Sequence, residues 1–137
     1  MINSEIFSKK LMEDDILMER TQDEDGVYFR VRQTLDYGND VVVAVFFTNS
    51  ESIVDINIFN IVQINNPAKK AELHSLLNEF NEKFRYIKFI DFDGHVAAQY
   101  SYNIEDHFNP QAVINYIGLF LNAAEKVYPA LIELKKA

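Results

Sequence analysis

The segment FIDFDGH at residues 89–95 holds the residue types that come closest to a catalytic motif in this chain. An apolar strand that ends in two nearby carboxylates can offer one as a nucleophile and the other as a ligand for a magnesium ion. Asp91 and Asp93 have that arrangement. A small metal-dependent phosphohydrolase that uses Asp91 and Asp93 is therefore one function to weigh.

The same string resembles, over five residues, the Asp-x-Asp-Gly motif of the haloacid dehalogenase-like hydrolases. That family has a threonine or serine after the glycine, where this chain has His95, and it needs a further lysine and an acidic pair on a large parallel sheet. Only 43 residues follow Gly94. Asp93 and Gly94 also suit the mirror-image turn of a β-hairpin, so we expect a hairpin and keep the phosphohydrolase as the alternative.

Three histidines, His74, His95 and His107, are the candidates for imidazole catalysis or metal binding. No two of them stand at a spacing typical of metal sites. DEDG at residues 23–26 matches part of a calcium loop, but Arg32 falls where that loop needs a bidentate glutamate. The chain also has no cysteine and no GxSxG motif. We therefore expect no enzyme, no metal and no cofactor.

The charge of the chain is negative and is concentrated near its start. With 21 acidic and 13 basic side chains the formal net charge is -8, which disfavours a nucleic-acid partner. Residues 1–25 hold eight acids against three bases, a surface that could attract a basic protein. The longest apolar run, Val41–Phe47, is too short for a membrane helix, which needs about 20 residues. Acidic residues near the N-terminus also argue against a secretory signal, so we expect no membrane partner and a cytoplasmic location.

The spacing of apolar residues predicts a single domain over residues 1–137. The order of elements is helix, three strands, helix, two strands and helix, with an extra short strand near residues 16–21. We expect Ser4 to cap the first helix and Pro129 to kink or end the last one, which in the first case continues at a changed angle over residues 130–136. This order predicts the α+β class, with a twisted antiparallel sheet packed by helices. The expected helices cover residues 3–14, a segment from Asn66 and Pro67 to Phe84, and a segment from Asn109 and Pro110 to Pro129, and the expected strands cover residues 27–35, 41–48, 53–64, 86–92 and 95–104.

Apolar residues exceed what one buried face of this sheet needs. The strand at residues 41–47 is apolar on both faces, and in the next strand Phe59 and Ile61 share a face with Asp55 and Asn57. A central strand of that kind must be covered on both sides. The cover could be a helix of the chain, a second copy or a client protein, and we favour a partner. The candidates for the contact are Tyr28, Phe46, Phe59 and Ile61.

Two long stretches carry a resemblance to a known family. LLNEFNEKFRYIKFIDFDGHVAAQYSYNI and the later NPQAVINYIGLFLNAAEKVYPALIEL resemble the YbjN-like family of bacterial sensory transduction regulators. In that family a helix with Leu-x-x-x-Asn precedes a strand, an Asp-Gly hairpin and a second strand, and a long helix closes the domain. The matching positions here are Leu77, Asn81, Phe89, Asp93, Gly94 and the stripe from Ile117 to Leu131.

This resemblance implies a fold similar to that of the type III secretion chaperones. It also implies a non-enzymatic role in which the domain binds protein, often as a dimer, and it implies no catalytic residue. We therefore expect a regulatory or chaperone-like module that binds a protein partner or itself, with a homodimer favoured. The contact would bury apolar sheet surface, and the open edges of the sheet could add a strand of the partner.

Overall fold

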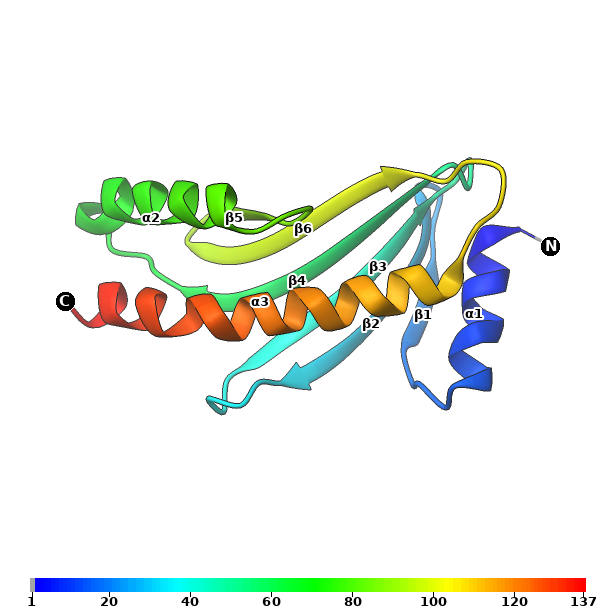
Figure 1. Cartoon of the computed structure of the whole chain (residues 1–137), viewed down its shortest axis with the longest axis horizontal. Coiled ribbons are helices and arrows are strands. Elements are labelled where there is room, and N and C mark those ends of the chain that lie inside the picture. The colour runs from blue at the N-terminus through cyan, green and yellow to red at the C-terminus, as the bar shows by residue number, and fades with distance from the viewer. Residues whose placement is uncertain (1) are drawn as a thin grey trace.

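The computed structural model describes residues 2–137 and has two layers (Figure 1). One layer is a six-stranded antiparallel sheet with the strand order β1-β2-β3-β4-β6-β5, and the other layer consists of helices. The predicted α+β class and the order of its elements are confirmed, including the extra short strand, which is β1. The elements are α1 Asn3–Glu13, β1 Glu19–Gln22, β2 Gly26–Thr34, β3 Asp40–Thr48, β4 Ile53–Gln63, the 3-10 turn η1 Pro67–Lys69, α2 Lys70–Lys83, β5 Lys88–Phe92, β6 His95–Asn103 and α3 Pro110–Lys136.

The predicted turn and helix-start signals appear where the sequence placed them. Asp93 and Gly94 have φ angles of 51° and 88°, the left-handed pair that a tight hairpin between β5 and β6 requires. The Asn66 side chain accepts a hydrogen bond from the amide of Ala68 at the start of η1. Asn109 accepts the first free amides of α3 in the same way.

The cap of α1 differs from the prediction. Ser4 is not the N-cap but lies buried in the first turn, where its amide and its hydroxyl donate to the two carboxylate oxygens of Glu51, each at 2.7 Å. The Asn3 side chain also donates to the Glu51 carbonyl oxygen at 2.7 Å. A carboxylate from the β3–β4 turn therefore caps α1 and ties it to the sheet.

The helix α3 does not end at Pro129. It runs unbroken for 27 residues to Lys136, with Pro129 exposed inside it. Between Ile2 and Ala137 no helix combines the length and the hydropathy that a bilayer crossing requires.

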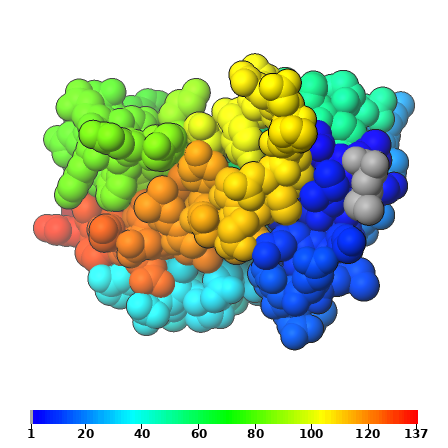
Figure 2. All heavy atoms as spheres, turned by 45° about the vertical axis from the view of Figure 1, so that its right-hand side comes forward, coloured from blue at the N-terminus to red at the C-terminus, as the bar shows by residue number. Residues whose placement is uncertain are grey.

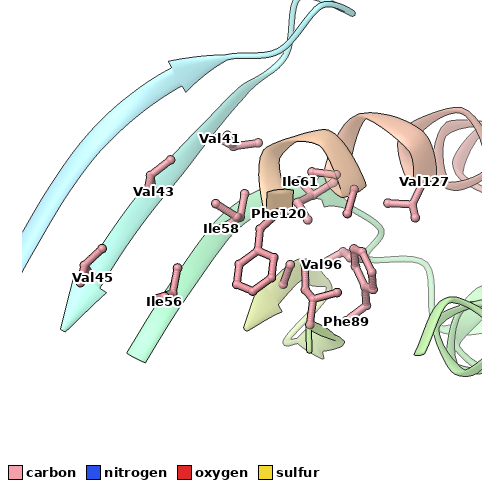
Figure 3. Close-up of a cluster of buried hydrophobic side chains, with 14 of the residues drawn as sticks. Val41, Val43, Val45, Ile56, Ile58, Ile61, Phe89, Val96, Phe120 and Val127 are labelled. Atoms are coloured by element: carbon pink, nitrogen blue, oxygen red, sulfur yellow. The ribbon is translucent and has the colours of Figure 1, made fainter. Parts of the chain in front are cut away.

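All three helices pack on the same face of the sheet. In an antiparallel sheet, residues directly opposite each other share a face. Phe7 of α1 packs edge-on against Phe29 of β2 at 5.0 Å between ring centroids, and Phe80 of α2 packs against Phe89 of β5 at 5.5 Å. Figure 3 shows Phe120 of α3 pointing into the side chains of the same face. Figure 2 shows α3 between α2, in green, and α1, in blue.

Aromatic rings fill the contact between α3 and β6. Tyr116 of α3 lies 5.1 Å from Tyr100 and 5.9 Å from Tyr102, both on β6, and 5.6 Å from Tyr86, measured between ring centroids. Burial, followed by the neighbouring phenols of Tyr116 and Tyr100, raises the pKa of Tyr102 to about 12. We call these four residues the tyrosine cluster.

Candidate functional site

The side of the sheet that faces away from the helices carries three of the four predicted contact residues. The register places Tyr28 opposite Phe46, and Val42 opposite Phe59. All four side chains are partly exposed, and the helices of residues 2–137 pack on the opposite side. We call these four residues the outer face. The structure thus leaves open the second side of the apolar strand β3.

An aromatic pair dominates one end of the outer face. The rings of Tyr28 and Phe46 are 4.4 Å apart between centroids and inclined by 34°. The Phe46 ring also lies over Gly26, where a Cβ atom would come within 2.8 Å of the ring and 2.0 Å of the Phe47 carbonyl oxygen. Only glycine fits at that position, so the close packing of β2 against β3 holds the ring in place.

Asn57 lies between the apolar residues of the same face. Its register partners are Ala44 on β3 and Gln99 on β6. The residue is 6% exposed, and its Oδ1 atom has no hydrogen-bond partner among the described residues. A buried acceptor without a partner costs about 1–3 kcal/mol. The outer face therefore contains an acceptor that a donor from a bound protein could satisfy if the covering side chains moved.

Ile61, the fourth predicted contact residue, does not lie on the outer face. It is 1% exposed, and Figure 3 shows it among the core side chains beside α3. The prediction assumed an unbroken alternation along the strand, but β4 has a bulge between Ile58 and Val62, where Asn60 adopts a φ of 62°. A bulge adds residues to one strand and changes which face the next side chains occupy, so Ile61 turns inward.

The edges of the sheet are less open than expected. On β5, the Asn81 side chain donates to the Phe89 carbonyl oxygen at 3.1 Å and accepts the Phe89 amide at 2.6 Å. The amide group of Asn81 thus pairs with the edge strand as another main chain would. The opposite edge, β1, has four residues, all exposed, and a short polar edge is a poor template for strand pairing. The sequence showed Asn81 only as part of a motif and indicated no role for it.

A second candidate site is a hollow of about 380 Å³ between α2 and the β5–β6 turn. One carboxylate oxygen of Asp91 lies 2.8 Å from Nε2 of His74, and the other accepts the amide of Gly94 at 2.7 Å. Burial alone would raise the pKa of Asp91. The hydrogen bonds from His74 and Gly94 and the positive charges of His74 and Lys70 outweigh it and lower that pKa below its usual value.

This geometry does not support the phosphohydrolase. Both oxygens of Asp91 have partners that join α2 to the hairpin, and the strands on either side of the turn are antiparallel. His95 begins β6, and His107 lies in the loop before α3, so the histidines do not assemble into one centre. Within residues 2–137 no group of three histidine or carboxylate side chains is placed to hold a metal ion.

Most acidic residues of the first 25 positions lie in α1, in the α1–β1 connection and in the β1–β2 turn, but Glu19 of β1 is opposite Arg30 and therefore shares the side of the sheet that carries the outer face. In that turn one carboxylate oxygen of Asp23 accepts the amides of Asp25 and Gly26 at 2.8 and 3.2 Å, the geometry of a simple hairpin turn. Desolvation, followed by the charges of Asp23 and Asp25, raises the pKa of Tyr28. The side of the sheet that carries the outer face holds charges of both signs. Arg30 and Arg32 of β2 lie on it together with Glu19 and Asp55, so charge alone does not select a basic partner for this face.

Comparisons with known proteins agree with this architecture. A structure described as "Crystal structure of YbjN, a putative transcription regulator from E. coli" has a similar fold, with a TM-score of 0.56 and 10% sequence identity over 93% of this chain and 89% of that chain. No curated protein sequence matches the chain. The YbjN family model, described as "Putative bacterial sensory transduction regulator", matches residues 4–133. Because that match spans nearly the whole sequence, this chain belongs to the YbjN family.

Proposed function

We propose that this protein is a non-enzymatic regulatory module that binds another protein through the outer face of its sheet. One observation carries the proposal: Tyr28, Val42, Phe46 and Phe59 lie on a face from which the helices of the described chain are absent. The description of the family as a sensory transduction regulator supports a role in signalling. A chaperone-like mode of binding and a cytoplasmic location are parts of this proposal.

The outer face has the properties of a small protein-binding surface. Burial of its apolar area contributes roughly 25 cal/mol per Å² removed from water. The rings of Tyr28 and Phe46 form a rigid aromatic anchor, a residue type enriched where binding energy is concentrated. Movement of the side chains that cover Asn57 would expose its free acceptor, which would favour a partner with a donor at that position. The occupant is either a second copy of the chain or a different protein.

Phe59→Asp tests the proposal because it places a carboxylate on the outer face. The control is Asn60→Asp, which adds the same charge at the neighbouring exposed bulge residue, where aspartate tolerates the left-handed backbone. We expect both variants to keep the circular dichroism spectrum of the parent. Only Phe59→Asp should lose the protein that the parent binds.

Two measurements on the parent and both variants identify the occupant. Sedimentation velocity at several concentrations detects a second copy, and recovery of bound proteins from native lysate, followed by reconstitution from purified components, detects a different protein. If Phe59→Asp keeps the solution mass of the parent and every protein that the parent retains, the outer face is not the contact.

A further inference from the structure

An apolar groove lies on the other side of the molecule, between α3 and the connection from α2 to β5. Its volume is about 240 Å³, and its lining includes Phe84, Ile87 and Phe120. Two further lining residues are large and exposed, with exposed fractions of 55% for Tyr86 and 48% for Leu119. We call this feature the Tyr86 groove. Exposed apolar side chains beside a cavity are typical of a binding site.

A strained turn holds Tyr86 at the groove. The residue has a φ of 71°, and the amide of Ile87 donates to the Arg85 carbonyl oxygen across it at 2.8 Å. A three-residue turn with positive φ is rare and costly for an aromatic residue. The Tyr86 ring packs 5.6 Å from Tyr116 and 5.7 Å from Tyr100, so the tyrosine cluster supports it as a fixed wall. Strain that persists in this way often marks a functional position.

The charge beside the Tyr86 groove is positive. Arg85 and Lys126 are exposed residues of its lining, and that lining contains no acidic residue. Neither side chain forms an ion pair with the residues that the structure describes. The chain has a net charge of -8, yet two positive charges stand unpaired beside this apolar cavity. The occupant that fits both features is an apolar side chain with carboxylates next to it.

The chain itself presents a segment of that chemistry. Met12 and Leu17 are the most exposed large apolar residues described, with exposed fractions of 77% and 87%. Glu13, Asp15 and Glu19 stand within a few positions of them in the sequence and are exposed. We call Met12–Glu19 the acidic segment.

The acidic segment is held rigidly. The amide of Ile16 donates to the Leu11 carbonyl oxygen at 2.9 Å, and the amide of Asp15 donates to the Met12 carbonyl oxygen at 3.3 Å. With Asp15 at a φ of 55°, these bonds form the left-handed cap that commonly ends a helix. The residues on either side of Leu17 pack against the core. Leu17 is therefore presented outward with little conformational freedom to lose on binding.

One chain cannot join the two features within itself, because α1 and α2 lie at opposite ends of the helical layer with α3 between them (Figures 1 and 2). We propose that the acidic segment of one copy binds the Tyr86 groove of a second copy. Leu17 enters the apolar cavity, and the carboxylates around it lie beside Arg85 and Lys126. Self-association then uses the helical side of the molecule and leaves the outer face free for a different protein.

Two single variants and their mixture test this contact. Leu17→Asp disables the acidic segment, and Leu119→Asp disables the groove; both residues are exposed, so both variants should fold as the parent does. Sedimentation velocity should show self-association of the parent and an increase of at least about tenfold in the dissociation constant of each variant, which corresponds to about 1.4 kcal/mol. An equimolar mixture should form a 1:1 complex, because each variant supplies the part that the other lacks.

Several results would overturn the proposal: a parent that stays monomeric at all concentrations, either variant associating as the parent does, or a mixture that stays monomeric. A charge test adds a matched control. Lys126→Glu should weaken the association, whereas Lys135→Glu, an exposed lysine of the same helix outside the groove, should not; equal effects would contradict the role of Lys126. If Phe59→Asp alone abolished self-association, the contact between copies would lie on the outer face. The proposed use of the Tyr86 groove would then be wrong, while the proposed function would stand.

Discussion

Replacement of Asn81 by alanine should open the β5 edge of the sheet. The Asn81 side chain makes two hydrogen bonds with the main chain of Phe89, one as donor and one as acceptor. Alanine removes both and leaves the amide and the carbonyl of a residue that is 2% exposed without these partners. The change therefore tests whether a helix side chain takes the place of a neighbouring strand.

The expected loss of stability follows from these bonds. A hydrogen bond within a protein contributes about 0.5–1.5 kcal/mol net, so two contribute about 1–3 kcal/mol. We expect the upper part of this range because Phe89 is buried and water reaches it poorly. A urea dependence of about 1–3 kcal/mol per M, usual for small proteins, converts the loss into a midpoint shift on the order of 1 M.

Urea unfolding followed by circular dichroism measures this shift, with Asn78→Ala as the control. Asn78 is exposed on the same helix, and the structure shows no hydrogen bond from its side chain. Both variants gain the same helix propensity from alanine, so the difference between them isolates the contacts with Phe89. Hydrogen exchange at the Phe89 amide should accelerate only in Asn81→Ala.

Equal midpoints for the two variants, together with unchanged exchange at Phe89, would refute the reasoning. That result would mean that water or the neighbouring strand satisfies the β5 edge as well as Asn81 does. A lower midpoint with unchanged exchange would assign the loss to helix packing instead of the edge.

Three further predictions concern single contacts. The lowered pKa of Asp91 means that its carboxylate stabilises the fold above about pH 4 and that this contribution disappears as the pH falls through the folded-state pKa. In urea unfolding, Asp91→Asn should therefore unfold more easily than the parent near neutral pH, with a difference that shrinks in acid. Asp93→Asn, at a residue of the same turn where asparagine tolerates the left-handed backbone, should keep the neutral-pH stability of the parent. Glu51→Gln weakens the cap of α1 by about 1–2 kcal/mol and should speed hydrogen exchange in that helix. The control Glu5→Gln changes an exposed acid in the first turn of α1 and should not. Gly26→Ala forces a Cβ atom to within 2.0 Å of a carbonyl oxygen and should cost at least about 2 kcal/mol in urea unfolding.

Much of this fold could be predicted because its signals are local. The turn at Asp93 and Gly94 and the caps at Asn66 and Asn109 depend on residues only a few positions apart. The alternation of apolar and polar residues likewise placed β2 and most of β4, and the continuous apolar run at residues 41–47 placed β3. Because successive side chains of a strand point to opposite faces, this alternation was enough to place Tyr28, Phe46 and Phe59 on the helix-free side of the sheet.

The features that escaped prediction depend on partners far away in the chain. Ser4 looked like a helix cap because its own neighbours permit that role, but the capping carboxylate belongs to Glu51, 47 residues later. Asn81 acts on a strand that follows its own helix. The bulge that turns Ile61 inward arises where β4 pairs with β6, so the sequence of β4 alone does not reveal it.

The tyrosine cluster has a practical consequence for optical spectroscopy. The chain contains seven tyrosines and no tryptophan, so tyrosine alone provides its near-ultraviolet emission. Four of the seven rings belong to the cluster, and at centroid separations of 5.1–5.9 Å excitation can pass from ring to ring before a photon leaves. A low anisotropy of the tyrosine fluorescence should therefore indicate intact contact between α3 and β6. Separation of these two elements should raise that anisotropy. With its pKa near 12, Tyr102 should keep a neutral chromophore in alkali that already ionises ordinary phenols.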